Sequence, residues 1–166
     1  AKKIQTHGGS IRVYVTKNNK QKINNSVKKI LLIEKKKLNK KSFKNFKQNV
    51  VLSKVRLYSL LKNLKSKKNI IYGVGAPSRA ATLVNYVGLN EDIVNCILEI
   101  KGSYKIGKYM PGTNIPILNE NIIKQKKPDY LLLLSWHISK SLIQNFKKLG
   151  FKGKFIIPLT KPRIVK

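Results

Sequence analysis

IIYGVGAPSRAATLVNYVGL, residues 70–89, is the stretch that decides the fold. Its first five residues, Ile70–Val74, suit a strand buried on both faces. Gly73 and Gly75 then allow a tight turn and a close approach of the backbone to a ligand. Ser78 is expected to cap the next helix, and Arg79 lies in its first turn, where it can reach an anion. Ser78 stands where the dinucleotide fingerprint has its third glycine, so spacing alone leaves open a phosphate site or a ligand-free turn.

The rest of residues 69–166 alternates apolar strands with helices. Strands are expected at Ile70–Val74, Val94–Glu99, Ile115–Leu118, Tyr130–Leu134 and Lys154–Ile157, and helices at Ser78–Val87, Glu120–Lys126 and Ser139–Leu149. This alternation predicts an α/β fold with a Rossmann-like, doubly wound parallel sheet. Its ligands are expected beyond the carboxyl ends of the strands, where residues 75–79, 100–114 and 135–139 form loops.

The part of the chain before residue 69 has a different pattern, and we divide the sequence into residues 1–16, 17–68 and 69–166. Between Ile4 and Thr16, Ile11, Val13 and Val15 alternate with polar residues, which predicts a strand with one buried face. Asn24–Lys68 is expected to be a basic helical linker, although residues 42–49 are ambiguous.

Composition and charge exclude several classes of protein. The net charge is +30, but the excess is almost entirely Lys and only four Arg occur, so we expect no specific nucleic-acid binding. No apolar run reaches the length of a membrane span, and the first residues lack the apolar core of a signal peptide, which favours the cytoplasm. Cys96 is the only cysteine and is expected to be a buried core thiol.

Polar residues after the predicted strands are the candidate ligand contacts. Glu99 ends the second strand, where an acidic residue commonly accepts hydrogen bonds from a ribose. In the following loop, Lys105 and Lys108 are candidates for phosphate, and Tyr104 or Tyr109 for stacking on a base or sugar. The alternative is a basic connection without a ligand.

The two histidines are open to two interpretations each. His137 follows the fourth strand, where it either contacts a ligand or caps the next helix. His7 is expected in a structural turn rather than as a base. No second histidine or carboxylate lies at metal-ligand spacing from His137, so we expect no metal site.

Several segments together resemble one family. They are HGGSIRVYV (residues 7–15), GAPSRAATLVNYVGL (75–89), GKYMPGTNIPI (107–117), and the short runs Pro128–Tyr130 and Ser135-Trp136. The chain resembles the C-terminal region of S-adenosylmethionine-dependent sugar C-methyltransferases, which act on nucleotide-linked deoxysugars. The resemblance implies a Rossmann-like domain that binds the nucleotide-sugar, and it makes residues 1–16 the remnant of a methyl-transfer core. The family often has Lys-Gly-Asn at Arg79–Ala81 and Asp-Asn-Pro from Glu99 onward, so the identity of the sugar nucleotide stays open.

The resemblance also implies what this sequence lacks. Such enzymes carry a zinc-binding cysteine cluster, a glycine motif for S-adenosylmethionine and a Tyr-x-Glu-His catalytic motif, and none of them occurs here. The chain is therefore expected to be a C-terminal piece of such an enzyme, inactive alone. S-adenosylmethionine would bind only in the intact enzyme, and the partners would be a nucleotide-linked sugar and the missing N-terminal methyltransferase domain.

The prediction for the site follows from both arguments. We expect no catalytic residue in this chain, and substrate contacts at Gly73, Gly75, Ala76, Ser78, Arg79, Glu99, Lys108, Tyr109, Pro111, Gly112, Thr113 and His137. Two other functions are weighed: a stand-alone nucleotide-dependent Rossmann oxidoreductase, and a basic nucleic-acid-binding module. The missing third glycine and the absence of a plausible Tyr-Lys or Cys-His pair count against the first, and the scarcity of Arg counts against the second.

Overall fold

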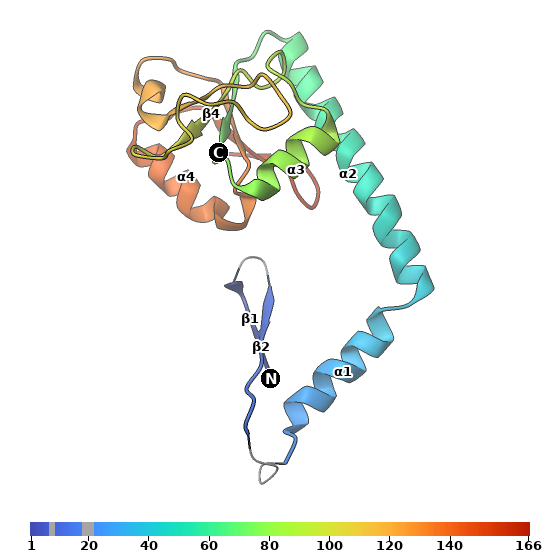
Figure 1. The fold of residues 1–166 in the computed structure, drawn as a ribbon. Helices are drawn as coiled ribbons and strands as arrows, with labels where there is room; N and C mark the ends of the chain where they lie inside the picture. The colour runs from blue at the N-terminus through green and yellow to red at the C-terminus, as the bar shows by residue number, and fades with distance from the viewer. Residues whose placement is uncertain (7–8, 18–21) are drawn as a thin grey trace. The chain divides into compact units, whose positions relative to one another are not determined.

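A computed structural model describes residues 1–6, 9–17 and 22–166 (Figure 1). The chain divides into two compact units, Ala1–Val50 and Val51–Lys166. The boundary between them falls within one helix, α2 (Lys40–Ser66). The two units are described separately below. The predicted turn at His7 lies outside the described residues.

The second unit is built on one six-stranded sheet with the order β5-β4-β3-β6-β7-β8. Its strands are β3 (Ile71–Val74), β4 (Cys96–Glu99), β5 (Ile117–Asn119), β6 (Tyr130–Leu133), β7 (Lys154–Ile157) and β8 (Arg163–Val165). All neighbours pair in parallel except β7 and β8. Gly73 lies at the centre, with Ile97 opposite it on one side and Leu132 on the other.

Helices and their side chains cover both faces of this sheet. On one face, buried residues of α2 and of α3 (Ser78–Val87) pack on Ile71, Ile97 and Leu132. On the other face, Phe146 of α4 (Ser139–Lys148) and a 3₁₀ helix, η2 (Glu120–Lys124), pack on strand residues that include Phe155. Alternate residues of each strand serve the two cores, as the pleat of a strand requires. The predicted doubly wound α/β fold is confirmed.

Local differences from the expectation have physical reasons. The third predicted helix is the 3₁₀ helix η2, whose five residues are too few for a stable α-helix. The short antiparallel edge strand β8 was not predicted, because three residues after Pro162 carry no readable alternation. Ser78 as N-cap is wrong by one position: Pro77 is the cap residue, and Ser78 is already helical. Gly88 ends the helix as expected, with φ +81°.

The first unit contains a hairpin and helical segments. β1 (Lys2–Ile4) pairs antiparallel with β2 (Ser10–Arg12), and α1 (Asn25–Lys37) begins after Asn24, whose side chain accepts from the Ser26 N–H. The helical prediction for this part is confirmed, including the ambiguous residues 42–49, which lie in α2.

The strand predicted between Ile4 and Thr16 is wrong in its extent and its burial. Among the described residues of this range, β2 covers only Ser10–Arg12, and Ile4 belongs to the separate strand β1. The side chains of Val13 and Val15 are 64% and 86% exposed. Alternation defines an apolar face, but burial also requires something to cover that face. Within the described part of the first unit no residue is buried.

Candidate ligand site at the carboxyl edge of the sheet

The topology of the second unit points to one edge of its sheet. From β3 the chain proceeds to β4 and β5 on one side, and then crosses to β6 and β7 on the other. The order therefore reverses between β3 and β6. Ligands of such sheets bind at this switch point, outside the carboxyl ends of the strands. The loops that leave β3 and β6 there begin at Gly75 and Leu134.

Gly75 is required by the geometry of this turn. Its φ is +83°, and its N–H donates to the Leu98 carbonyl at 2.9 Å. A Cβ placed on Gly75 would lie 2.5 Å from the Oγ of Ser135, so the turn and the loop after β6 touch. The turn that the sequence predicts is thus present, and it meets the loop of the neighbouring strand.

Gly73 has a packing role of its own. It is buried inside β3, where a Cβ would lie 2.9 Å from Cγ1 of Ile97 and 3.1 Å from Cδ1 of Leu134. The absence of a side chain lets β3 approach its covering residues closely. This contact with the core accounts for the glycine, and its predicted contact with substrate stays a prediction.

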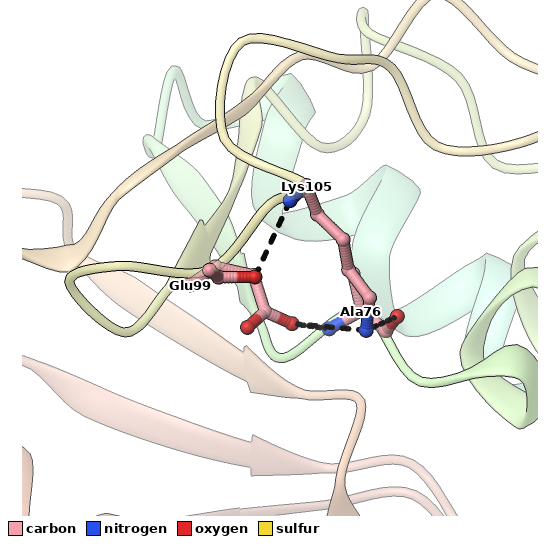
Figure 2. A network of polar contacts seen from close by, with 4 residues as sticks. Ala76, Glu99 and Lys105 are labelled. Carbon is pink, nitrogen blue, oxygen red and sulfur yellow. Dashed lines mark hydrogen bonds and ion pairs between the residues drawn. The ribbon is translucent and has the colours of Figure 1, made fainter.

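Ala76 is held on both of its backbone polar groups (Figure 2). Its N–H donates to Oε1 of Glu99 at 2.5 Å, and its carbonyl accepts from Nζ of Lys105 at 2.8 Å. Lys105 Nζ also lies 3.9 Å from the same Glu99 oxygen. The side chains of Glu99 and Lys105 are 13% and 29% exposed, so this ion pair is partly shielded from water. We call these three residues the Ala76 clasp.

A second carboxylate, Glu120, lies near the clasp and was missed by the sequence analysis. Asn119, the last residue of β5, lies opposite Glu99 in the sheet, and Glu120 follows it directly. Burial raises the pKa of the Glu120 carboxyl, and the charge of Glu99 raises it further. The position of Glu120 directly after a strand next to β4 is the signal that would have found it.

Arg79 lies beside the loop of β6. Its guanidinium carbon is 6.0 Å from the centre of the Trp136 ring, at the outer limit of a cation–π contact, and the residue is half-buried. Ser78, before it, is exposed. Trp136 and His137 belong to the short 3₁₀ helix η3 (Trp136–Ile138), and His137 is half-buried. The structure therefore brings Arg79 and the Ser135–His137 loop together.

The loop after β4 is more regular than expected. The Gly107 N–H donates to the Ile117 carbonyl at 3.0 Å, and the Ile117 N–H donates to the Lys108 carbonyl at 2.8 Å. Tyr109 and Pro116 form an antiparallel bridge. Residues 107–117 thus fold back as a hairpin, which we call the 107–117 hairpin.

The tip of the 107–117 hairpin is tied to α3. Asn85 Nδ2 donates to the Pro111 carbonyl and to the Ala81 carbonyl, at 2.8 Å each. Gly112, with φ +78°, packs directly on the Asn85 side chain, and the Thr113 hydroxyl donates to the Met110 carbonyl. These contacts explain in structural terms why Pro111, Gly112 and Thr113 stand at the tip of the hairpin. Asn85 was noted in the sequence only as part of the resemblance.

Side chains near the base of the hairpin form a basic and aromatic group, in which Lys105 is half-buried and Tyr104, Lys108 and Tyr109 are exposed. The Lys108 and Lys105 ammonium groups lie 5.3 and 5.8 Å from the centre of the Tyr104 ring. Tyr104 is 78% exposed and Tyr109 is 62% exposed. The predicted residues therefore separate into three groups: the glycine turn with Glu99 and Arg79, the Tyr104–Lys108 group, and the tip at residues 111–113.

Two hollows of the surface lie away from the carboxyl edge. One hollow of about 290 Å³ lies at the amino ends of β6 and β7, lined by residues that include Lys127, Phe151 and Gly153. Another lies along α2, between Ser59 and Ser66. The described residues contain no group of three or more His, Cys, Asp or Glu side chains placed to hold a metal ion. Nor is any helix among them long and apolar enough to cross a membrane.

Comparisons with known proteins give two findings. Residues 5–160 match the family described as C-methyltransferase C-terminal domain. The chain is also similar to the C-methyltransferase NovU of Streptomyces niveus, with 29% identity over 113 residues. That alignment covers 68% of this chain but only 27% of the relative, so the chain corresponds to roughly a quarter of that enzyme.

Proposed function

The chain belongs to the family of C-methyltransferase C-terminal domains, and we propose that it is the nucleotide-sugar-binding domain of a sugar C-methyltransferase. In this proposal the substrate is a deoxysugar linked to a nucleotide, and the methyl donor is S-adenosylmethionine. The donor and the catalytic groups are supplied by a separate methyl-transfer domain. The domain described here contributes recognition of the substrate and no catalytic residue.

One observation carries the proposal: the glycine turn, Arg79 and the Ser135–His137 loop meet at the switch point of a doubly wound sheet. The first N–H groups of a helix have no partner within the helix, and its dipole favours an anion there. Arg79 in the first turn of α3 adds a full positive charge. The diphosphate of a nucleotide-sugar has the charge and shape that such an arrangement binds.

The remaining predicted residues would make further contacts with the substrate around this diphosphate site. Lys108 and Tyr109 are exposed at the base of the hairpin, where they are available to a phosphate and to a sugar or base. His137 lies two residues after Ser135, which touches the turn, in the loop that follows β6. The methyl-transfer domain would close over the carboxyl edge. Residues 1–16 would belong to that domain's core, residues 17–68 would be the linker, and residues 69–166 the substrate-binding domain.

The test is the loss of substrate affinity on removing the Arg79 charge. Arg79→Ala is expected to weaken binding of a nucleotide-linked deoxysugar by roughly 1.5–3 kcal/mol, the magnitude of a charge-assisted hydrogen bond. Calorimetric titrations at one fixed ionic strength measure this loss, since a chain of net charge +30 attracts any anion. Titration with the free sugar separates the contribution of the diphosphate.

Arg56→Ala is the matched control, because Arg56 is an exposed arginine on α2 and its loss changes the net charge equally. Urea unfolding of both variants checks that the fold is intact. If Arg79→Ala loses no more affinity than Arg56→Ala, the ligand does not bind at this turn. Tighter binding of a nicotinamide dinucleotide or an oligonucleotide than of the nucleotide-sugar would favour one of the two other functions.

A further inference from the structure

The Ala76 clasp places a carboxylate where a phosphate would otherwise bind. In a phosphate-binding glycine turn the backbone N–H groups donate to the ligand's oxygens. Here the Ala76 N–H already donates to Glu99, and Lys105 holds both the Ala76 carbonyl and the Glu99 carboxylate. The turn therefore contains an anion of its own, supplied by the end of β4.

We propose that Glu99 is a built-in competitor that keeps phosphate off the Ala76 N–H, and that Lys105 is the positioning residue that holds it there. The inference rests on the proposed function in that it specifies which part of a nucleotide-sugar this turn accepts. The N–H of Ala76 is reserved for Glu99, so the diphosphate binds on the Arg79 side. The ligand group that faces Glu99 is uncharged.

Electrostatics supports this assignment. A phosphate oxygen that accepted from the same N–H would lie within a few ångströms of the Glu99 carboxylate and be repelled by it. The repulsion is poorly screened, because the Glu99 side chain is only 13% exposed. Glu120 adds a second acidic group, close enough to Glu99 for that charge to raise its pKa. The single cation of the clasp, Lys105, is already paired.

Lys105 acts through Glu99 rather than on the ligand. Its ammonium group bridges the carbonyl of the turn and the carboxylate at the end of β4, two segments far apart in the sequence (Figure 2). It therefore stabilises the carboxylate against the turn, and its own positive charge is paired with that carboxylate. Once Glu99 is neutral, the same ammonium group becomes available to an anion at Ala76.

The experiment uses inorganic pyrophosphate, which has the diphosphate charge but neither sugar nor base. The wild-type chain is expected to bind it weakly. Glu99→Gln should bind it at least fivefold more tightly, because the repulsion is removed and Lys105 is released. Asp92→Asn is the control, since it removes the same charge from an exposed residue near the amino end of β4. A gain for Glu99→Gln no larger than for Asp92→Asn overturns the inference.

A second measurement locates the anion. The Ala76 amide resonance should shift on addition of pyrophosphate in Glu99→Gln and stay in place in the wild type and in Asp92→Asn. A shift of similar size in the wild type would show that phosphate reaches this N–H despite Glu99, which overturns the inference. The spectra also report whether each variant keeps its fold.

The role of Lys105 is tested in the Glu99→Gln background. Adding Lys105→Met should return the pyrophosphate affinity to within twofold of Asp92→Asn, whereas Lys105→Arg should retain most of the gain. A double variant with Met that keeps the full gain overturns the role of Lys105. Failure of the proposed function is distinguishable: if no variant binds a nucleotide-linked deoxysugar but the pyrophosphate gain persists, the clasp stands and the substrate assignment falls.

Discussion

The two ends of helix α2 carry the same apolar stripe but differ in burial. Phe43 and Phe46, near its start, are 60% and 67% exposed, whereas Leu57 and Leu61 are fully buried against the sheet. All four residues lie at helical spacing on one stripe. The difference shows that an amphipathic pattern makes a helix able to bury a face, while burial itself depends on a partner surface. The same contrast holds between the two units, because every buried side chain of the described chain lies in the second.

Hydrogen exchange provides the strongest test of this contrast. Amides of β6, which has a parallel neighbour on each side, should exchange only through global unfolding, and those of β1 and β2 through local opening. Typical stabilities of domains predict a difference of roughly 10³-fold or more in protection. Exchange followed by mass spectrometry or NMR measures it. Equal protection of β6 and the hairpin would mean that the first unit has a cooperative core of its own.

A pair of substitutions on α2 tests the contrast within one helix. Leu61→Ala should lower the free energy of unfolding of the second unit by about 2–5 kcal/mol, because it leaves a cavity against the sheet. Phe46→Ala, on the exposed end, should change it by less than about 0.5 kcal/mol. Urea unfolding can be followed by the fluorescence of Trp136, the only tryptophan, which lies in the second unit. Comparable losses for the two variants would contradict the assignment of the stripe.

The second unit contains the only cysteine of the sequence, the buried Cys96. Its ionisation should lower the stability of this unit at alkaline pH. Burial raises the pKa of the Cys96 thiol from its ordinary 9.0 to about 12, although Lys126 lowers it somewhat. The unfolded chain therefore loses this proton before the folded chain does. The contribution of the neutral thiol to the free energy of unfolding is therefore complete below pH 9. It falls by about 1.4 kcal/mol per pH unit as the pH rises from 9 toward 12.

The Cys96→Val variant isolates this contribution, because the many lysines titrate equally in both proteins. Urea unfolding from pH 9 upward should show a steeper loss of stability for the wild type than for the variant. Parallel pH profiles would mean that the thiol is hydrated in the folded state. The sheet would then be less tightly packed at β4 than the 3% exposure of Cys96 indicates.

The sequence predicted several residues of the candidate site but not the contacts between them. Gly75, Arg79 and Glu99 were predicted from their places after strands and in the first turn of a helix, and they do lie at one edge of the sheet. The partners of these residues were not predicted. Glu99 accepts from the turn itself, Lys105 bridges Glu99 and the turn, and Asn85 holds residues 111–113. These contacts join segments that are distant in the sequence, and the spacing of residues along the chain carries no information about them.

The sequence by itself determined the local and periodic features of this protein. The apolar runs, the glycine at φ +83° and the helical stripes fix strands, turn and helices, because these depend on neighbouring residues and on the period of the backbone. They also determine the order of strand and helix, and so the doubly wound sheet. Only the tertiary structure decided which apolar faces are covered and which charges meet. Burial and ion pairing are properties of two surfaces brought together, and each segment of sequence describes only one of them.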